Sequence, residues 1–230
     1  KMKEYGVPCT MLTGQECIEE PDSRVVASTI EMADYDELYD IVVIDEAQLM
    51  ADTDRGHSWT KAILGVKARE IHVCTSPAAE GVLKHLIELT GDTWEAHRYE
   101  RKTSLVFEDL AFDFPEDVRR GDALIVFSKK SVLDVAGRLE ERGISASVIY
   151  GSLPPEIRRR QMHLFTSKRT EVVVSTDAIG MGLNLPVRRI VFLQADKFDG
   201  TGRRPLCTSE IRQISGRAGR FGIYDTGYVN

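Results

Sequence analysis

The sequence predicts an α/β protein in which parallel β-sheets are flanked by helices. Short runs rich in Val and Ile alternate along the chain with amphipathic segments of helical period. The apolar runs are nearly continuous, as in strands that are covered on both faces. Alternation of strand and helix is typical of parallel layers. With 230 residues, the chain is long enough for two compact domains of about 100 residues each.

The individual elements follow from these runs. Strands are expected at residues 7–12, 24–29, 40–45, 70–76, 123–128, 145–151, 170–176 and 188–194. Helices are expected at residues 60–68, 78–91, 131–143 and 154–165. Gly91 and Gly143 stand where helices commonly end in a left-handed residue. Pro154 and Pro155 stand at a helix start, where a missing N–H has the least effect.

The domain boundary is expected within residues 101–121, which separate a first domain of residues 1–100 from a second of residues 122–230. This linker segment is charged and contains Pro115, and a new apolar run follows it. Residues 1–100 hold 20 acidic and 9 basic side chains, whereas residues 101–230 hold 16 and 21. The basic excess indicates that the second part attracts a polyanion; a drift in surface composition is the alternative.

The composition excludes several classes of protein. No apolar run approaches the roughly 20 residues of a membrane span, so no membrane partner is expected. The four cysteines lie far apart without a CxxC pair, which indicates free thiols in a reducing compartment and argues against a disulfide framework or a zinc site. The five histidines show no metal-ligand spacing.

An acidic pair follows the strand expected at residues 40–45. Asp45 and Glu46 stand side by side at its end, in the stretch IVVIDEAQ. Nucleotide hydrolases use carboxylates in this position to hold Mg²⁺ and to activate water. One carboxylate orients the hydrated ion, and its neighbour accepts a proton from the attacking water. An acidic loop after a buried strand is the alternative interpretation.

Three further stretches follow expected strands in the second domain. VVVSTDAIGMGLNLP places Ser175, Thr176 and Asp177 before a turn with Gly180 and Gly182. Hydroxyls and free N–H groups in such a turn suit phosphate contacts, and a glycine-rich connector is the alternative. FSKK at 127–130 and YGS at 150–152 offer hydroxyls, amides or positive charge that suit the backbone of a single strand, although ordinary loops have the same composition.

The stretch QISGRAGRFG, residues 213–222, places two arginines after glycines. In a continuous helix, Gln213, Arg217 and Arg220 recur at i, i+4 and i+7 and share one face. Gly216 and Gly219 would each destabilise that helix by roughly 1 kcal/mol relative to Ala, which indicates that another surface approaches closely. Arginines on such a face suit a transferring phosphoryl group; a solvated basic face is the alternative.

The start and the inner side of this helix are also predicted. Thr208 or Ser209 is expected to cap it, with Glu210 in its first turn. The apolar residues expected to face the core are Ile211, Ile214 and Ala218.

In their order along the chain, these motifs resemble a known series. DEAQ, TSPAA, VFSKK, YGSLPPE, STDAIGMGLN and QISGRAGRFG resemble the motifs of superfamily-two helicases of the DEAD/DEAH-box kind. The chain is most similar to the mitochondrial degradosome RNA helicase family and its bacterial relatives. The resemblance extends from YGVPCTMLTGQE at 5–16 to the end of the chain. It implies two RecA-like domains that bind ATP and Mg²⁺ between them, with RNA crossing both.

The resemblance also implies roles for particular residues. Asp45 and Glu46 correspond to the magnesium-binding and water-activating pair, and Gln48 to the last residue of the box, near the domain interface and among the positions that bind the nucleotide. Thr75 and Ser76 resemble the motif that couples hydrolysis to strand movement. The positions implied to contact nucleic acid are Thr29, Glu31, Ser128, Gly151 and Thr176. The positions implied to lie near the ribose are Asp177 and Gly182, and those implied to reach the γ-phosphate are Gln213, Arg217 and Arg220.

One departure from the family pattern concerns the phosphate-binding loop. The family begins with a glycine-rich loop that ends in GK[ST]. Gly14 is followed here by Gln and Glu, and the chain contains no GK pair. The loop is therefore expected upstream of Lys1, and this chain alone is expected to hydrolyse ATP poorly.

The expected activity is that of an ATP-dependent RNA helicase core, acting in RNA turnover. A catalytically inactive RNA-binding module and a DNA helicase or translocase with the same core are the alternatives. The resemblance suggests a 3′-to-5′ exoribonuclease as a partner. The expected location is the bacterial cytoplasm or the mitochondrial matrix, and secretion is not expected.

Overall fold

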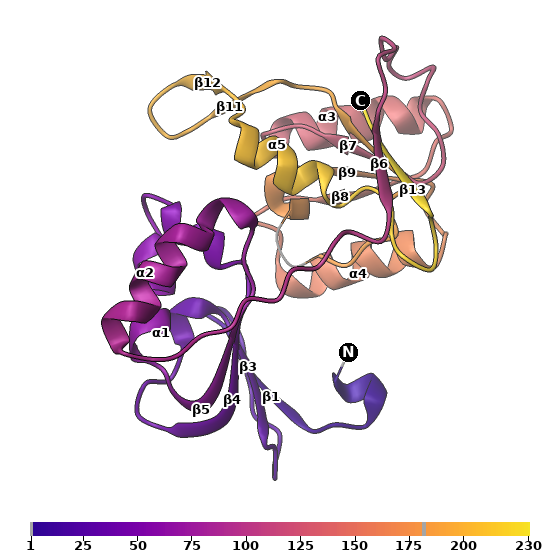
Figure 1. The fold of residues 1–230 in the computed structure, drawn as a ribbon. Coiled ribbons are helices and arrows are strands. Elements are labelled where there is room, and N and C mark those ends of the chain that lie inside the picture. Colours follow the sequence, from indigo (N-terminus) through magenta and orange to yellow (C-terminus); the bar gives the residue numbers. More distant parts are fainter. Residues whose placement is uncertain (1, 181–182) are drawn as a thin grey trace. The chain divides into compact units, whose positions relative to one another are not determined.

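The computed structural model describes residues 2–180 and 183–230. They form two compact units, Lys1–Arg98 and Tyr99–Asn230 (Figure 1). The α/β class predicted from the sequence is confirmed, because strands alternate with helices and the largest sheet is parallel. Within the described residues, no helix combines the length and the apolar character needed to cross a membrane.

The first unit contains two small sheets. β1 (Cys9–Leu12), β2 (Cys17–Ile18) and β3 (Val25–Ser28) form a sheet in the order β2-β1-β3, in which β1 and β3 run parallel. β4 (Leu38–Ile44) and β5 (Lys67–Val73) form a parallel pair. The helices of this unit are η1 (Met2–Tyr5), η2 (Ile30–Met32), η3 (Ala47–Ala51), α1 (Gly56–Gly65), η4 (Pro77–Ala79) and α2 (Glu80–Thr90).

Helices α1 and α2 cover one face of the β4–β5 pair. Ile44 packs there against Trp59 and Ile63 of α1 and Leu83 of α2. The alternate residues Ile41 and Val43 are 58% and 63% exposed, so the described residues cover only one face of β4. Within the described residues, the expectation that the strands are covered on both faces is therefore not met for β4. A nearly continuous apolar run does not by itself show which of its faces is packed.

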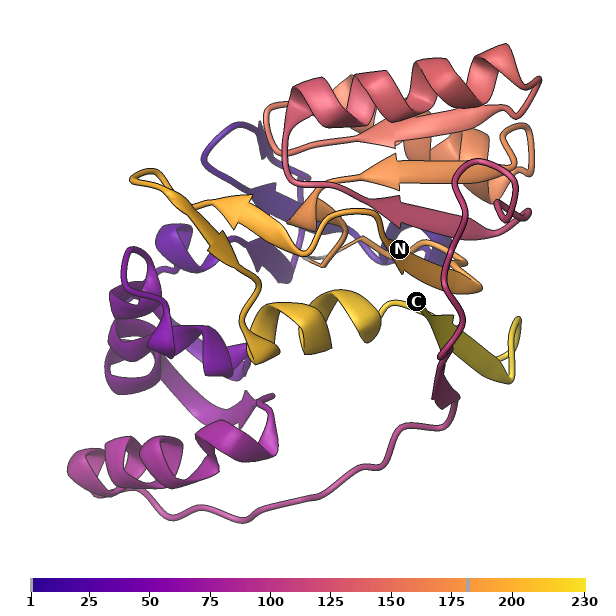
Figure 2. The same ribbon diagram turned by 90° about the horizontal axis from the view of Figure 1, so that it is seen from above.

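The second unit is built on a parallel sheet of six strands in the order β6-β13-β10-β7-β9-β8. Its strands are β6 (Ser104–Phe107), β7 (Asp122–Ile125), β8 (Ala146–Ile149), β9 (Val172–Ser175), β10 (Arg189–Phe192) and β13 (Thr226–Val229). The helices are α3 (Lys129–Glu141), α4 (Pro155–Thr166), η5 (Asp177–Gly180) and α5 (Thr208–Ser215). An antiparallel hairpin of β11 (Asp196–Phe198) and β12 (Arg203–Pro205) leads into α5 (Figure 2).

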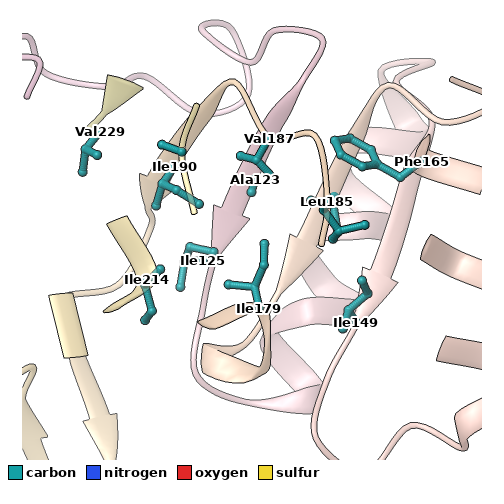
Figure 3. Close-up of a cluster of buried hydrophobic side chains, with 12 residues drawn as sticks. Ala123, Ile125, Ile149, Phe165, Ile179, Leu185, Val187, Ile190, Ile214 and Val229 are labelled. Atoms are coloured by element: carbon teal, nitrogen blue, oxygen red, sulfur yellow. The ribbon is translucent and has the colours of Figure 1, made fainter. Parts of the chain in front are cut away.

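Alternate residues of the central strands build the two cores of this unit. Leu124 and Val126 contact the face that α3 covers, where Val132 and Leu139 are buried. Ile125 lies on the other face, where it packs with Phe165 of α4 and Ile214 of α5 (Figure 3). Strand residues alternate between faces, so a sheet with helices on both sides needs apolar residues throughout.

The eight strands and four helices expected from the sequence are all present, with shifted ends. The left-handed conformations of Gly91 and Gly143 are confirmed, as is the helix start at Pro155. The sequence did not predict β2, β6, β11, β12 and β13. Residues 101–121, expected to form a linker, contain β6, which pairs with β13 and belongs to the sheet of the second unit.

A buried arginine fixes the remainder of that segment to the sheet. The Arg189 side chain is 8% exposed and donates two hydrogen bonds to the carboxylate of Asp122, which is 2% exposed, at 3.0 and 2.6 Å. It also donates to Glu108 at 3.2 Å and to the carbonyl of Asp117 at 2.8 Å. The contacts attach residues 108–117 to β10.

A second charged network attaches the β11–β12 hairpin to α5. Glu210 accepts hydrogen bonds from both terminal nitrogens of Arg204 at 2.9 and 2.8 Å, and it pairs with Lys197 at 2.7 Å. Lys197 also pairs with Asp177 of η5 at 3.1 Å. The Arg204 guanidinium, together with Lys197, holds the pKa of Glu210 well below its usual range, although burial opposes this effect. Lys197 thereby links η5, the hairpin and α5.

We predict that Arg189→Met lowers the free energy of unfolding of the second unit by roughly 3–5 kcal/mol, because it leaves the buried Asp122 without its partner. Urea denaturation measures the difference. The matched control is Arg188→Met, one residue earlier, where the arginine is exposed and the loss is expected to stay below about 1 kcal/mol. Equal losses in the two variants would contradict the prediction.

We predict that Glu210 makes the stability of the second unit depend on pH in the acid range. Its pKa is depressed in the folded state, so its contribution is present above the unfolded value of about 4.3 and is lost as the pH falls through the folded value. Glu210→Gln should flatten the dependence of unfolding free energy on pH below about pH 5. Glu156→Gln, an exposed carboxylate in α4, serves as control, and the idea fails if both variants keep the wild-type slope.

Candidate functional site

The first site lies where β4 and β5 end. The parallel register pairs Ile44 with Val73, so Asp45 and Glu46 leave the sheet beside residues 74–76. The amide of Cys74 donates to the carbonyl of Ile44 at 2.8 Å, and the amide of Ala47 donates to the carbonyl of Cys74 at 2.9 Å. Backbone pairing thus brings together two sequence motifs that are about thirty residues apart.

Gln48 connects these two motifs through its side chain. Its Nε2 donates to the Glu46 carboxylate, and its Oε1 accepts a hydrogen bond from the amide of Ser76 at 3.2 Å. Thr75 has a buried hydroxyl without a hydrogen-bond partner in the part of the chain that the structure describes. The site therefore includes every residue that the sequence placed in the acidic box and in the coupling motif.

The backbone at the acidic pair is constrained. Glu46 adopts a left-handed conformation, with φ 54° and ψ 39°, which is uncommon for a residue with a side chain and is found most often at functional positions. The indole of the buried Trp59 donates to the carbonyl of Asp45 at 3.0 Å. The Asp45 carboxylate accepts a hydrogen bond from the Glu46 amide at 2.9 Å.

The resulting pocket has a volume of about 300 Å³ and is lined by Asp45, Glu46, Gln48, Cys74, Thr75 and Ser76. No group of three or more His, Cys, Asp or Glu side chains within the described residues is arranged to hold a metal ion. Two carboxylates in an open pocket nevertheless fit Mg²⁺, which proteins commonly bind through one or two carboxylates, with water and substrate phosphates as the other ligands.

Thr29 and Glu31 lie in a different part of the first unit. Thr29 precedes η2, and its side chain does not cap that helix. Glu31 is paired with Arg55, whose Nε and a terminal nitrogen donate to the same carboxylate oxygen at 2.8 and 2.6 Å. Burial opposes ionisation of Glu31, but a backbone hydrogen bond and Arg55 outweigh it and lower its pKa.

In the second unit, three predicted contact residues follow neighbouring strands. Ser128, Thr176 and Gly151 come after β7, β9 and β8, which are adjacent and parallel. Parallel strands end at one edge of a sheet, and ligands of open α/β sheets bind outside that edge. The structure therefore brings these three residues to a common edge.

These residues also have local structural roles. Ser128 caps α3, because its hydroxyl accepts a hydrogen bond from the amide of Ser131 at 3.0 Å. The hydroxyl of the buried Thr176 accepts from the amide of Ala178 at 3.3 Å. The carbonyl of Gly151 accepts from Arg158 at 2.8 Å.

The prediction that Gln213, Arg217 and Arg220 share a helical face is wrong. Helix α5 ends at Ser215, and the arginines lie in the loop of residues 216–222, which we call the arginine loop. Gly219 has φ +71°, and its amide donates to the carbonyl of Val187 at 2.9 Å. This pairing with a neighbouring segment replaces the helical hydrogen bonds.

Other details of the predicted helix also differ. Cys207 is the N-cap of α5, in place of Thr208 or Ser209. Glu210 lies in the first turn as expected, and its carboxylate accepts a hydrogen bond from the Cys207 amide at 2.9 Å. Ile214 and Ala218 are buried as expected, whereas Ile211 is exposed. The Cys207 side chain accepts from the backbone at the third helical position, and Glu210 accepts from the Cys207 amide, so the two residues form a capping box.

The two arginines contact the end of η5 and Asn184. Arg217 donates through Nε to the carbonyl of Gly180 at 3.0 Å, and Arg220 donates to the carbonyl of Asn184 at 3.3 Å. Gln213 lies against the same segment, because a Cβ on Gly180 would be 3.5 Å from its side chain. Gly182, which the resemblance implies near the ribose, lies outside the described residues.

Sequence reasoning missed residues that support these loops. Gln194, after β10, accepts a hydrogen bond from the Phe127 amide at 2.9 Å and so fixes the start of the 127–130 stretch. Lys197 pairs with Asp177, and Arg101 donates to three carbonyls of the arginine loop. Each contact joins positions that are distant in the sequence, so no local pattern could have indicated them.

Two family models match the chain. The DEXQ-box helicase domain of Suv3 matches residues 1–99, and the helicase conserved C-terminal domain matches residues 104–222. The chain is 45% identical to the mitochondrial ATP-dependent RNA helicase SUV3L of Oryza sativa subsp. japonica, over 99% of this chain and 32% of that protein. It is 40% identical to the mitochondrial ATP-dependent RNA helicase SUV3 of Saccharomyces cerevisiae, over 94% of this chain and 30% of that protein. The chain thus spans about a third of the length of these relatives.

Solved structures with the same fold include S. cerevisiae Dbp5 bound to RNA and ADP BeF3, with a TM-score of 0.64 and 17% identity over 97% of this chain and 63% of that chain. Another is the Mycobacterium smegmatis helicase Lhr bound to single-stranded DNA and AMP-PNP, with a TM-score of 0.65 and 17% identity over 99% of this chain and 36% of that chain. The chain belongs to the helicase family, with a Suv3-type DEXQ-box domain in its first unit and the helicase conserved C-terminal domain in its second.

Proposed function

We propose that this chain is the core of an ATP-dependent RNA helicase that couples ATP hydrolysis to unwinding of RNA or translocation along it. The observation that carries the proposal is the pocket of the first unit, where Gln48 joins the acidic pair to Ser76. Relatives of the chain are named mitochondrial ATP-dependent RNA helicases.

In the proposed mechanism, the two carboxylates of the pocket have different roles. The exposed Asp45 would hold Mg²⁺, which supplies positive charge to neutralise the nucleotide phosphates. Glu46 would accept a proton from the attacking water. Gln48 contacts both Glu46 and the backbone of Ser76, so a movement of Glu46 during hydrolysis would reach the coupling motif, Thr75 and Ser76.

The arginine loop supplies the positive charge in this proposal. Arg217 and Arg220 donate to neutral carbonyl oxygens, whereas an ionised phosphate adds the attraction of opposite charges and can accept two parallel hydrogen bonds from one guanidinium. A γ-phosphate can therefore displace these carbonyls. Gln213 would orient the phosphate, and Asp177 and Gly182 would lie near the ribose.

RNA is proposed to cross the sheet edge that carries Ser128, Thr176 and Gly151, with Thr29 and Glu31 as the corresponding positions of the first unit. Hydroxyls and backbone groups suit sugar and phosphate, which carry no sequence information. Because Glu31 is bound to Arg55, we propose that it acts through that arginine and not by touching a phosphate. By family resemblance, we further propose a mitochondrial location and a 3′-to-5′ exoribonuclease partner in RNA turnover.

We predict that Glu46→Gln lowers RNA-stimulated ATP hydrolysis by the full-length protein about 10²- to 10⁴-fold, because the proton acceptor is lost. Glu70→Gln, an exposed carboxylate on β5, is the control and should leave the rate within twofold. Steady-state phosphate release measures both. A wild-type protein without ATPase activity would indicate an inactive RNA-binding module.

We predict that Arg217→Ala and Arg220→Ala each lower turnover about 10²-fold or more, since such arginines stabilise charge in the transition state. Binding of single-stranded RNA, measured by fluorescence anisotropy, should weaken far less. The same assays with single-stranded DNA and duplex DNA test the choice of RNA. Stimulation by duplex DNA alone would favour a DNA translocase.

A further inference from the structure

Four consecutive residues at the start of the second unit each contact the arginine loop or the chain just after it. Arg101 donates to the carbonyls of Gly216 at 3.1 Å and Gly219 at 3.4 Å, and also to that of Ala218. The ammonium of Lys102 lies 4.8 Å from the centre of the Phe221 ring. Thr103 and Ser104 make the other two contacts.

Thr103 is buried and packs closely against Gly219 of the loop. A Cβ on Gly219 would lie 2.8 Å from the Thr103 methyl and 2.7 Å from the backbone nitrogen of Gly227. The amide of Ser104 donates to the carbonyl of Asp225 at 3.1 Å and begins β6. Residues 101–104 therefore run along the loop and confine it from one side.

Arg101 binds the peptide groups next to Arg217 and Arg220. The three carbonyls that it binds belong to residues 216, 218 and 219, which flank Arg217 and precede Arg220. Fixing these peptide groups fixes the direction in which both side chains leave the backbone. The carbonyls lie at and beyond the C-terminal end of α5, where partial negative charge favours a cation.

We propose that Arg101 is a positioning residue for the arginine loop, which holds Arg217 and Arg220 in the orientation that the γ-phosphate requires. This inference rests on the proposed function of those two arginines. Arg101 lies three residues after the boundary between the two units. A change in the path of the connecting chain would therefore alter the loop directly.

The experiment uses the full-length protein and the variant Arg101→Gln, which keeps a polar side chain but loses the fork of donors. We expect kcat for RNA-stimulated ATP hydrolysis to fall about tenfold, with KM for ATP and Kd for single-stranded RNA within about threefold of wild type. Arg101→Lys should recover part of the loss. The control is Arg142→Gln, since Arg142 is half-exposed and pairs only with Glu116 among the contacts described for it; its kcat should stay within twofold.

A double variant separates positioning from a general loss of stability. If Arg101 acts through the loop, Arg101→Gln should add less than twofold to the loss caused by Arg220→Ala. The inference would be overturned if the losses of the two single variants multiplied in the double variant. An unchanged kcat in Arg101→Gln would also overturn it, as would a fall in RNA affinity as large as the fall in kcat.

Amide hydrogen exchange gives a second measurement that does not depend on hydrolysis. Arg101→Gln should speed exchange in residues 216–222, whereas Arg142→Gln should not. Unchanged exchange there would overturn the inference even if the protein proved to have no ATPase activity. Conversely, an active wild type with an unaffected Arg101→Gln variant would refute the positioning role and leave the proposed function intact.

Discussion

The second unit depends on a close contact between two glycine backbones. A Cβ on Gly227 would lie 2.4 Å from the carbonyl of Ala218, and one on Gly219 would lie 2.7 Å from the nitrogen of Gly227. Both distances are shorter than any side chain tolerates, and the atoms concerned belong to the backbone, which cannot move aside cheaply. The contact brings the arginine loop onto β13, and the Gly219 amide then pairs with Val187. Gly219 of QISGRAGRFG is thus explained by packing within the unit, and this packing holds the loop that carries the arginines.

Parallel strand pairing has the corresponding role in the first unit. The β4–β5 register delivers the acidic pair and the coupling motif to one sheet edge, and Gln48 then joins them through side-chain contacts. The left-handed backbone of Glu46 is held between this bond and the contact of Trp59 with the neighbouring carbonyl. Strain of this kind persists only where the surroundings determine the conformation. The geometry of the acidic pair therefore comes from the rigid helix and strands around it.

The sequence predicted those parts that depend on local pattern. Runs of Val and Ile identified eight strands, and amphipathic period identified four helices. The end of α5 was missed, because the spacing of Gln213, Arg217 and Arg220 fits a helix and only the tertiary contact of Gly219 prevents one. Strand β6 was missed because it lies in the charged segment that was interpreted as a linker, and β13 (Thr226–Val229) because its short run contains a glycine. The pairing of Glu31 with Arg55, 24 residues later, has no signature in a single sequence.

Two arginines, Arg189 and Arg101, attach the segment of residues 101–122 to the rest of the second unit. Their contacts differ in strength. Arg189 is buried and holds carboxylates, so separating it would expose an unpaired buried charge, which destabilises by several kcal/mol. Arg101 holds carbonyls, and hydrogen bonds from a charged donor contribute about 1.5–3 kcal/mol when they form. Water can replace Arg101 at the loop more easily than it can replace Arg189 in the interior. The arginine loop can therefore lose the contacts of Arg101 while β6 and the Gly219–Gly227 contact stay in place, and in our proposal the connecting chain acts on hydrolysis through Arg101.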